Sequence, residues 1–330
     1  MIRSSVFYLV LLAIPAASST LSAGEDKGFD TTGVPHTSVP AVNEPPAPKD
    51  FARADALMST DALGKLLAAK DPKLVIIDAR PDSDYVATHI FGARNIPSDP
   101  LQDPSAPPYF MPSVEVLKNL CAEMGINADS TVVIYDEDDG RLAARVWFTL
   151  HARGHEHVAI LDGGVSKWHD ERRPWVTDIP LPPARGTFEP SATLRGVCTF
   201  DDLPQFRTRS TMLGKLPAVS LIDARAMSEY TGEDVRGKIG GHIPGAANIE
   251  WCNLMSGPEH ARVWRSPPEI HALLRVAGLE KDQKICIYDQ AGGRSAHIYF
   301  TLWLMGFDHA CNYVGGWREY TKKDVIEIEK

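Results

Sequence analysis

The chain has 330 residues, a formal net charge of -9 and 44% hydrophobic residues. This length and apolar content are sufficient for two domains of average size, each with its own core. The acidic balance argues against a broad nucleic-acid surface and against attraction to anionic lipid. We therefore expect a globular protein with no nucleic-acid partner.

Residues 1–23 have the pattern of a secretory signal peptide. Arg3 supplies a positive charge, an apolar run follows over residues 6–14, and small residues precede position 24. The apolar run is too short for a membrane anchor, which needs about 20 residues, so we expect no membrane span. We expect the mature protein to be exported, either to a periplasm or out of the cell. Residues 24–50, rich in Pro, Gly, Thr and acidic residues, are expected to form a flexible tether.

From residue 51 onward the chain repeats its own landmarks. Three segments recur in the same order: Asp78-Ala79-Arg80 as Asp223-Ala224-Arg225, His89-Ile90-Phe91-Gly92-Ala93 as His242-Ile243-Pro244-Gly245-Ala246, and Gly163-Gly164 as Gly315-Gly316. The repeat is far longer than a solenoid unit, so it indicates two whole domains. We predict domains over residues 51–175 and 191–330, joined by a proline-rich linker over 176–190.

Within each copy, short apolar runs alternate with helical patterns. Residues 74–78, 132–135 and 159–161 are continuous apolar runs, as in strands that are buried on both faces of a parallel sheet. Ser266-Pro267-Pro268-Glu269 is a capping box of the kind that starts a helix. This alternation predicts an α/β fold in each domain, with a mainly parallel sheet and helices on both of its faces.

The five cysteines are few and widely spaced: Cys121, Cys198, Cys252, Cys286 and Cys311. None forms a C-x-x-C pair, so we expect neither a zinc site nor thioredoxin-like chemistry, and no metal or cofactor. Cys121 and Cys286 lie in apolar patterns and are interpreted as buried core residues. A Cys286–Cys311 disulfide is an open alternative if their strands are neighbours.

The clearest candidate site is a loop in the second copy between an apolar strand and an apolar helix. Its residues are Asp289, Gln290, Ala291, Gly292, Gly293, Arg294 and Ser295. In a parallel α/β sheet, ligands bind at the carboxyl ends of strands, opposite helix N-termini. The glycines allow successive N–H groups to point inward, and Arg294 adds a positive charge. The segment therefore predicts an anion-binding loop.

Taken together, these landmarks resemble the rhodanese family. The resemblance covers residues 55–325 and rests on the Asp-x-Arg strand ends, the 241–246 segment, the 289–295 loop and the late Gly315-Gly316-Trp317. The two-copy arrangement is similar to thiosulfate and 3-mercaptopyruvate sulfurtransferases. The resemblance implies that the first residue of the second-domain loop is a cysteine, which carries sulfane sulfur as a persulfide. In this chain that position is Asp289.

A carboxylate at this position changes the expected chemistry. It cannot form a persulfide, because that step needs a polarizable thiolate. Asp289 is itself an anion, so we expect it to accept the loop's hydrogen bonds and to exclude an external anion. We therefore expect a binding or scaffold module, with a small anionic sulfur compound or a protein as its partner. The alternative is an active thiosulfate or 3-mercaptopyruvate sulfurtransferase that uses a different residue.

The corresponding loop of the first copy is expected to have diverged. Its residues are Asp136, Glu137, Asp138, Asp139, Gly140 and Arg141. If the two Phe-Thr-Leu triplets at 148–150 and 300–302 set the register, this loop is one residue longer than the second-copy loop. Arg141 then does not align with Arg294. We interpret the loop as a solvated acidic turn, with a cation site as the alternative.

The resemblance also implies a role for one arginine of the first copy. Arg145, in the segment Arg145-Val146-Trp147, is implied to contact the second-domain loop and to help bind an anionic substrate. The alternative is an ordinary arginine on the surface of a helix.

Overall fold

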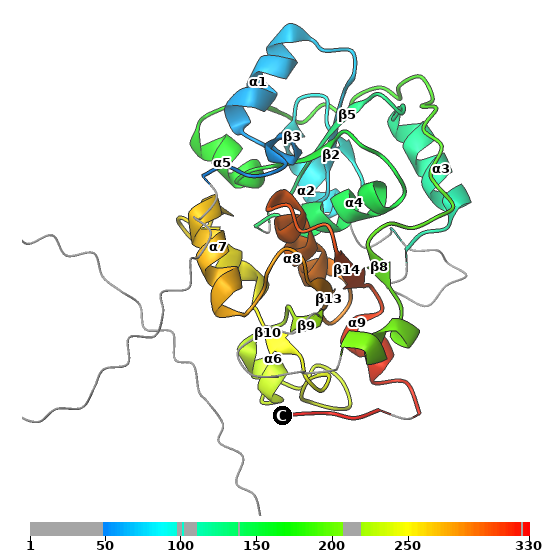
Figure 1. Ribbon diagram of the computed structural model, residues 1–330. Coiled ribbons are helices and arrows are strands. Elements are labelled where there is room, and N and C mark those ends of the chain that lie inside the picture. Colours follow the sequence, from blue (N-terminus) through cyan, green and yellow to red (C-terminus); the bar gives the residue numbers. More distant parts are fainter. Residues whose placement is uncertain (1–48, 98–100, 102–110, 138, 207–218, 325) are drawn as a thin grey trace, which may run out of the picture. The chain divides into compact units, whose positions relative to one another are not determined.

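The computed structural model describes residues 49–97, 101, 111–137, 139–206, 219–324 and 326–330. The expected signal segment, nearly all of the expected tether and Asp138 lie outside these residues. The described chain contains two five-stranded sheets in which every strand pair is parallel (Figure 1). The prediction of two α/β domains with mainly parallel sheets is therefore confirmed.

The sheet of the first domain has the strand order β1-β6-β5-β2-β4. Its strands are β1 (Leu57–Met58), β2 (Leu74–Asp78), β4 (Arg94–Asn95), β5 (Thr131–Tyr135) and β6 (Val158–Leu161). One face packs against α1 (Thr60–Ala69), α2 (Asp82–Ala87) and α5 (Gly164–Asp170). The other face packs against α3 (Val114–Met124) and α4 (Arg141–Ala152).

The sheet of the second domain has the order β10-β9-β13-β14-β8, which repeats the topology of the first. Its strands are β8 (Val197–Cys198), β9 (Val219–Asp223), β10 (Ala247–Asn248), β13 (Lys284–Tyr288) and β14 (Ala310–Tyr313). One face carries α7 (Pro267–Val276) and α8 (Gly293–Leu304), and the other carries η2 (Phe200–Phe206), α6 (Met227–Thr231) and α9 (Gly316–Tyr320). The matching strand orders support a duplication.

The remaining elements are short. Two antiparallel pairs lie outside the main sheets: β3 (His89–Ile90) with β7 (Trp175–Val176), and β11 (Met255–Ser256) with β12 (Val263–Trp264). Two 3-10 helices, η1 (Ala54–Ala56) and η3 (Trp251–Leu254), complete the list. Residues 177–190 of the expected linker form neither helix nor strand. Among the helices that the structure describes, none has the length and apolarity needed to cross a membrane.

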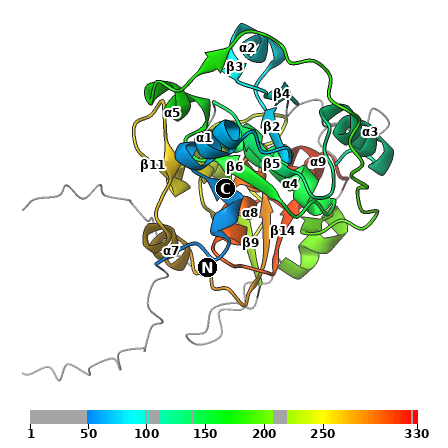
Figure 2. The ribbon, with the colours of Figure 1, turned by 90° about the horizontal axis from the view of Figure 1, so that it is seen from above.

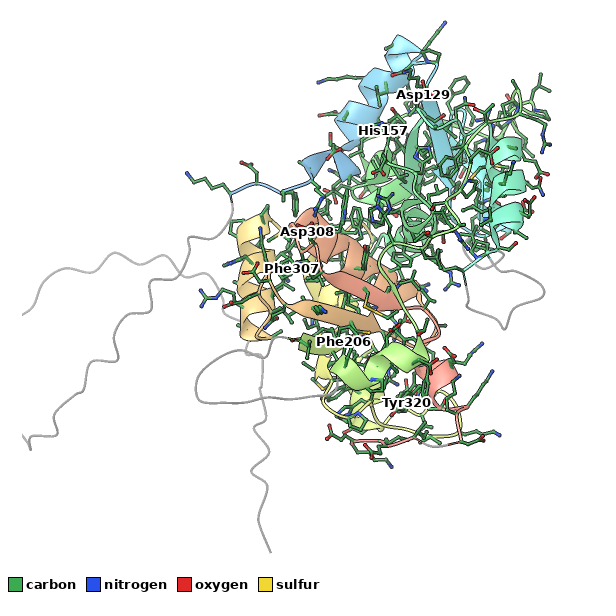
Figure 3. All side chains as sticks on the ribbon, turned by 45° about the vertical axis from the view of Figure 1, so that its right-hand side comes forward. Asp129, His157, Phe206, Phe307, Asp308 and Tyr320 are labelled. Atoms are coloured by element: carbon green, nitrogen blue, oxygen red, sulfur yellow. A yellow bond between two sulfur atoms is a disulfide. The ribbon has the colours of Figure 1, made fainter. Side chains whose placement is uncertain are left out.

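One hydrophobic core joins the two domains. Helices α4 and α8 lie side by side in both views (Figures 1 and 2). The Trp147 ring of α4 meets Phe300 of α8 edge to face with ring centroids 4.7 Å apart, and Phe148 meets Tyr299 at 4.9 Å. Such aromatic pairs add specific geometry to the burial of apolar area. Each domain also has a separate cluster on its outer face; Phe206 and Tyr320, labelled in Figure 3, belong to that of the second domain.

The repeated Asp-x-Arg segments form buried ion pairs at the strand ends. The Arg80 guanidinium donates to the Asp78 carboxylate with an Nη2–Oδ2 distance of 2.7 Å. The equivalent distance between Arg225 and Asp223 is 2.6 Å. In each domain the arginine also donates to a carbonyl of the following turn. These ion pairs hold the ends of β2 and β9 in place.

The disulfide differs from the alternative considered from the sequence. Cys286 and Cys311 do lie opposite each other on the neighbouring strands β13 and β14. The bond nevertheless joins Cys311 to Cys198, with their Cα atoms 5.7 Å apart. Cys198 comes from the edge strand β8, which contains only two residues and gives no strand signal in the sequence. Cys121 and Cys286 are buried core residues, as predicted.

Acid is expected to destabilise the protein through His297 of α8. This side chain is fully buried and stacks on Trp264, and burial lowers the pKa of His297 to about 3. In the unfolded chain a histidine titrates near ~6.5, so between these values the unfolded state binds more protons. The free energy of unfolding therefore falls as the pH drops through this window, by about 2–3 kcal/mol between pH 6.5 and 4.

Urea denaturation at pH 7 and pH 4 measures this loss. His297→Phe, which keeps a ring of similar size, should retain more of its stability at pH 4 than the parent protein. The exposed His157 provides the control, and His157→Gln should behave like the parent. An unchanged pH dependence in His297→Phe would contradict the assignment.

Candidate functional site

The expected loop of the second domain connects β13 to α8 at the carboxyl end of the sheet. Strand β13 ends at Tyr288, and α8 begins at Gly293 with Gly292 as its N-cap. Gly292 has a φ of 92°, in the left-handed region that favours glycine, and a side chain there would approach the Val314 carbonyl. The loop is thus a tight turn that aims its amide groups back at its own first residue.

The Asp289 carboxylate occupies this ring of amide donors. Its oxygens accept hydrogen bonds from the backbone N–H groups of Ala291 at 2.9 Å and Arg294 at 2.7 Å, and from that of Gly292. The Ser295 hydroxyl lies 3.4 Å from the same carboxylate. Asp289 is only 2% exposed. The loop is therefore an anion cradle whose anion is part of the chain.

The charge of Arg294 is neutralised inside the protein. Both of its terminal nitrogens donate to Glu229 of α6, with an Nη2–Oε1 distance of 3.1 Å, and its Nε lies 3.8 Å from Asp289. Burial disfavours the charged guanidinium, but the Glu229 hydrogen bonds and the Asp289 charge outweigh it, so the pKa of Arg294 is raised. Glu229 is 1% exposed. Sequence reasoning did not identify Glu229 as a partner of Arg294.

The connection between Tyr230 and His242 is eight residues longer than its counterpart between Tyr85 and His89, and this insertion covers one side of the loop. The Gln290 side-chain amide donates to the Arg236 carbonyl at 3.0 Å. The Trp317 indole donates to the Ile239 carbonyl at 3.2 Å. Both carbonyls belong to the connection between α6 and His242, so this segment fastens the loop and the start of α9 to the domain.

Two arginines of α4 approach the other side of the loop. Arg145 donates from Nη1 to the Ala291 carbonyl at 2.6 Å. An Arg141 guanidinium nitrogen lies 3.6 Å from the position that a side chain on Gly293 would take. The resemblance implied a contact between Arg145 and this loop, with an ordinary surface arginine as the alternative, and the structure shows the contact. Sequence reasoning missed Arg141, because Arg141 was assigned to the first-domain loop alone.

A small pocket lies beside this arginine contact. Among the described residues, its lining includes Arg145, Gly292 and Val314 together with Leu101, Met111, Phe148 and Thr149. Its volume of about 10 Å³ is at the lower limit for one water molecule, which needs ~10–15 Å³. At this size the pocket does not accommodate a multi-atom anion.

The first-domain loop repeats the carboxylate arrangement. Asp136 accepts hydrogen bonds from the backbone N–H groups of Gly140 at 2.9 Å, Leu142 at 2.7 Å and Ala143 at 2.8 Å. Helix α4 starts at Arg141 with Gly140 as its N-cap, so this loop is one residue longer than its counterpart, as the register indicated. Leu142, rather than Arg141, takes the place of Arg294.

Of the acidic residues that the structure describes in this loop, Asp136 and Asp139 are shielded from solvent, which corrects the interpretation from the sequence, whereas Glu137 is exposed. Asp136 is 1% exposed and saturated with amide donors. The Glu137 carboxylate lies 3.6 Å from Arg80, and Asp139 accepts from Arg262 at 3.2 Å. The negative charge of Asp136 is offset by backbone amides, and arginines far away in the sequence lie beside Glu137 and Asp139.

These features define a duplicated α/β protein. In each domain, the loop at the carboxyl end of the central strand directs its backbone amides at a carboxylate. A model of the family "Rhodanese-like domain" matches the chain twice, over residues 59–171 and 210–323. The chain belongs to the rhodanese family, in its tandem sulfurtransferase form.

Curated relatives match over almost their whole length. A thiosulfate sulfurtransferase of Azotobacter vinelandii is 32% identical over 286 residues, covering 85% of this chain and 99% of that protein. The sulfur carrier protein TtuD of Thermus thermophilus is 31% identical over 291 residues, covering 85% of this chain and 98% of that protein. Among solved structures, YnjE has a TM-score of 0.73 at 23% identity, covering 85% of this chain and 69% of that one. This structural similarity supports the fold.

Proposed function

We propose that the protein is a binding or scaffold module of the rhodanese family that does not transfer sulfur through its second-domain loop. In this proposal Asp289 stands where the family carries its persulfide-forming cysteine. The observation that carries the proposal is the buried Asp289 carboxylate, which already uses the three loop amides that would otherwise stabilise a thiolate or an external anion. A carboxylate oxygen has no persulfide chemistry.

The ligand class in this proposal is a small anionic sulfur compound or a protein partner. Arg145 and Arg141 of α4 supply the positive charge that faces the loop, while Arg294 is paired with Glu229. A relative is named as a sulfur carrier, and others are named as thiosulfate sulfurtransferases, which supports a sulfur compound as the ligand. Binding at this site requires Arg145 to exchange the Ala291 carbonyl for the ligand.

An active sulfurtransferase that uses another residue is the second candidate, favoured by the relatives named for that activity. Mass spectrometry after exposure to thiosulfate separates the two candidates. Our proposal expects no retained sulfur on any of the five cysteines. Stoichiometric sulfur on one of them would favour the second candidate.

The occupied cradle leads to a prediction for Asp289→Ala. Removing the carboxylate leaves the amides of Ala291, Gly292 and Arg294 without their acceptor and removes the negative charge that repels anions. Thiosulfate or sulfate should then raise the melting temperature of Asp289→Ala but not that of the parent protein. Asp136→Ala is the matched control for loss of a buried carboxylate. An equal anion-induced rise in the melting temperature of the parent and of Asp289→Ala would contradict the claim that Asp289 occupies the loop's anion site.

We also propose that the protein is exported, on the basis of the signal pattern in residues 1–23. Expression of the full chain in a Gram-negative host, followed by N-terminal sequencing of the periplasmic fraction, tests this. The expected mature protein begins near residue 24. An uncleaved chain that stays in the cytoplasm would contradict export.

A further inference from the structure

A second pocket lies at the amino ends of strands β13 and β14, whereas the Asp289 loop follows the carboxyl end of β13. The edge strand β8, helix η2 and the starts of these two strands line it, and it is open to solvent and measures about 320 Å³. This volume lies within the ~300–1,000 Å³ that is usual for small-molecule sites. The pocket is therefore large enough for a small ligand, unlike the space beside Arg145.

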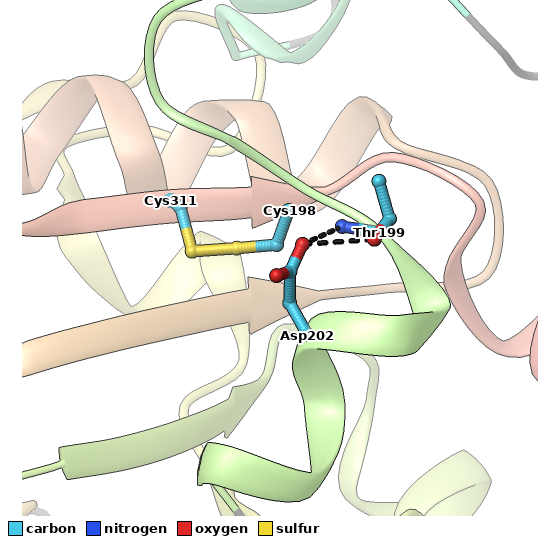
Figure 4. Close-up of a disulfide and its surroundings, with 4 residues drawn as sticks. All are labelled: Cys198, Thr199, Asp202 and Cys311. Carbon is cyan, nitrogen blue, oxygen red and sulfur yellow. Dashed lines mark hydrogen bonds between the residues drawn. A yellow bond between two sulfur atoms is a disulfide. The ribbon is translucent and has the colours of Figure 1, made fainter.

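The Cys198–Cys311 disulfide forms part of this pocket (Figure 4). Cys311 is partly exposed, whereas Cys198 is 2% exposed. The sulfur of Cys286 on β13 lies within 4.8 Å of both disulfide sulfurs. Burial raises the pKa of the Cys286 thiol, so it stays protonated and does not itself attack the disulfide. An incoming thiol therefore meets Cys311 first.

The charges around the pocket favour a negatively charged thiol. The Lys284 ammonium lies on an exposed side chain that lines the pocket at the start of β13. Among the described lining residues, Asp202 carries the one carboxylate, which accepts hydrogen bonds from the Thr199 N–H and hydroxyl, each at 2.8 Å (Figure 4). The Asp202 carboxylate is thus held against the β8–η2 turn, whereas the Lys284 ammonium is on an exposed side chain that can approach an incoming anion.

We propose that the Cys198–Cys311 disulfide is a thiol-exchange site for small anionic thiols, of which hydrosulfide is the simplest. The hydrosulfide sulfur attacks Sγ of Cys311, the Cys198–Cys311 bond breaks, and its electron pair leaves on Sγ of Cys198 as a thiolate. The products are a Cys311 persulfide and a free Cys198. The disulfide is reduced and the hydrosulfide sulfur is oxidised to the sulfane level, so no further reagent is needed. This site would let the second domain carry sulfur independently of Asp289.

The test treats the folded, full-length protein with sodium sulfide, blocks thiols by alkylation and maps the cysteine peptides by mass spectrometry. The expected result is one added sulfur on Cys311 and an alkylated Cys198, with a rate proportional to sulfide concentration. A rate independent of sulfide concentration would mean that unfolding of the protein, and not attack by sulfide, limits the reaction. That result would overturn the proposal, because the site must react in the folded protein. Added sulfur on Cys198 or Cys286 instead of Cys311 would also overturn it.

A surface variant tests the electrostatic part without breaking the disulfide. Lys284→Gln should slow the reaction by a factor of about 2–5 at low ionic strength, and added salt should reduce the difference. Lys281→Gln, at an exposed lysine outside the pocket lining, is the matched control and should react at the parent rate. Identical rates for Lys284→Gln and the parent would contradict selection for an anionic thiol.

Discussion

Replacing Asp289 by cysteine is expected to produce sulfur transfer from thiosulfate to cyanide, an activity that our proposal expects the parent protein to lack. The Ala291, Gly292 and Arg294 amides would face a thiolate in place of the carboxylate, and such donors at a helix N-terminus lower the pKa of a thiol. We expect thiocyanate formation about 100-fold above the parent protein, which corresponds to ~2.7 kcal/mol of the activation barrier. A colorimetric thiocyanate assay measures it.

Asp136→Cys is the matched control for this gain of activity. Asp136 also sits among three amide donors, but Leu142 stands where the second loop has Arg294. By helix register, α8 presents His297 where α4 presents Arg145. We therefore expect Asp136→Cys to stay inactive. A folded Asp289→Cys variant without activity would show that the second loop no longer accepts a donor.

Removing the charge of Glu229 is expected to be the most destabilising change near the site. Glu229→Gln leaves the Arg294 guanidinium, whose side chain is 13% exposed, with the more distant Asp289 as its nearest remaining counter-charge. Breaking a buried ion pair by removing one partner lowers the free energy of unfolding by about 3–5 kcal/mol. Because Arg294 keeps its contact with Asp289, we expect a loss of about 2–4 kcal/mol for Glu229→Gln. Chemical denaturation of parent and variant measures the difference in the free energy of unfolding.

A double variant distinguishes the ion pair from a general loss of packing. Adding Arg294→Met to Glu229→Gln removes the uncompensated charge and should restore at least half of the lost stability. Glu233→Gln, at an exposed glutamate on the insertion after α6, should change stability little. A double variant that is less stable than Glu229→Gln alone would contradict the claim that the uncompensated Arg294 charge causes the loss of stability.

Features governed by local pattern were predictable from the sequence. The apolar runs at 74–78 and 132–135 became the central strands β2 and β5, and the Ser266 capping box starts α7. The Phe-Thr-Leu register also showed that the first-domain loop has one extra residue. In each case neighbouring residues carry the information, through periodicity, capping or turn chemistry.

Features that depend on pairing between distant segments were not predictable. Glu229 and Arg294 are 65 positions apart, and the pairing exists because the insertion folds back over the loop. Cys198 pairs with Cys311 across 113 positions, through an edge strand too short to show a pattern. Asp139 is likewise held by Arg262 of the other domain. A single sequence contains no signal that links such partners.

The steady-state turnover of the parent protein with thiosulfate and cyanide tests the central claim most directly. If Asp289 occupies the place of the nucleophile, thiocyanate should form no faster than in buffer with heat-denatured protein. The Cys198–Cys311 disulfide does not alter this expectation, because its persulfide requires hydrosulfide and each disulfide reacts once. Sustained turnover at about 1 s⁻¹ or faster, within the usual enzymatic range, would contradict the claim.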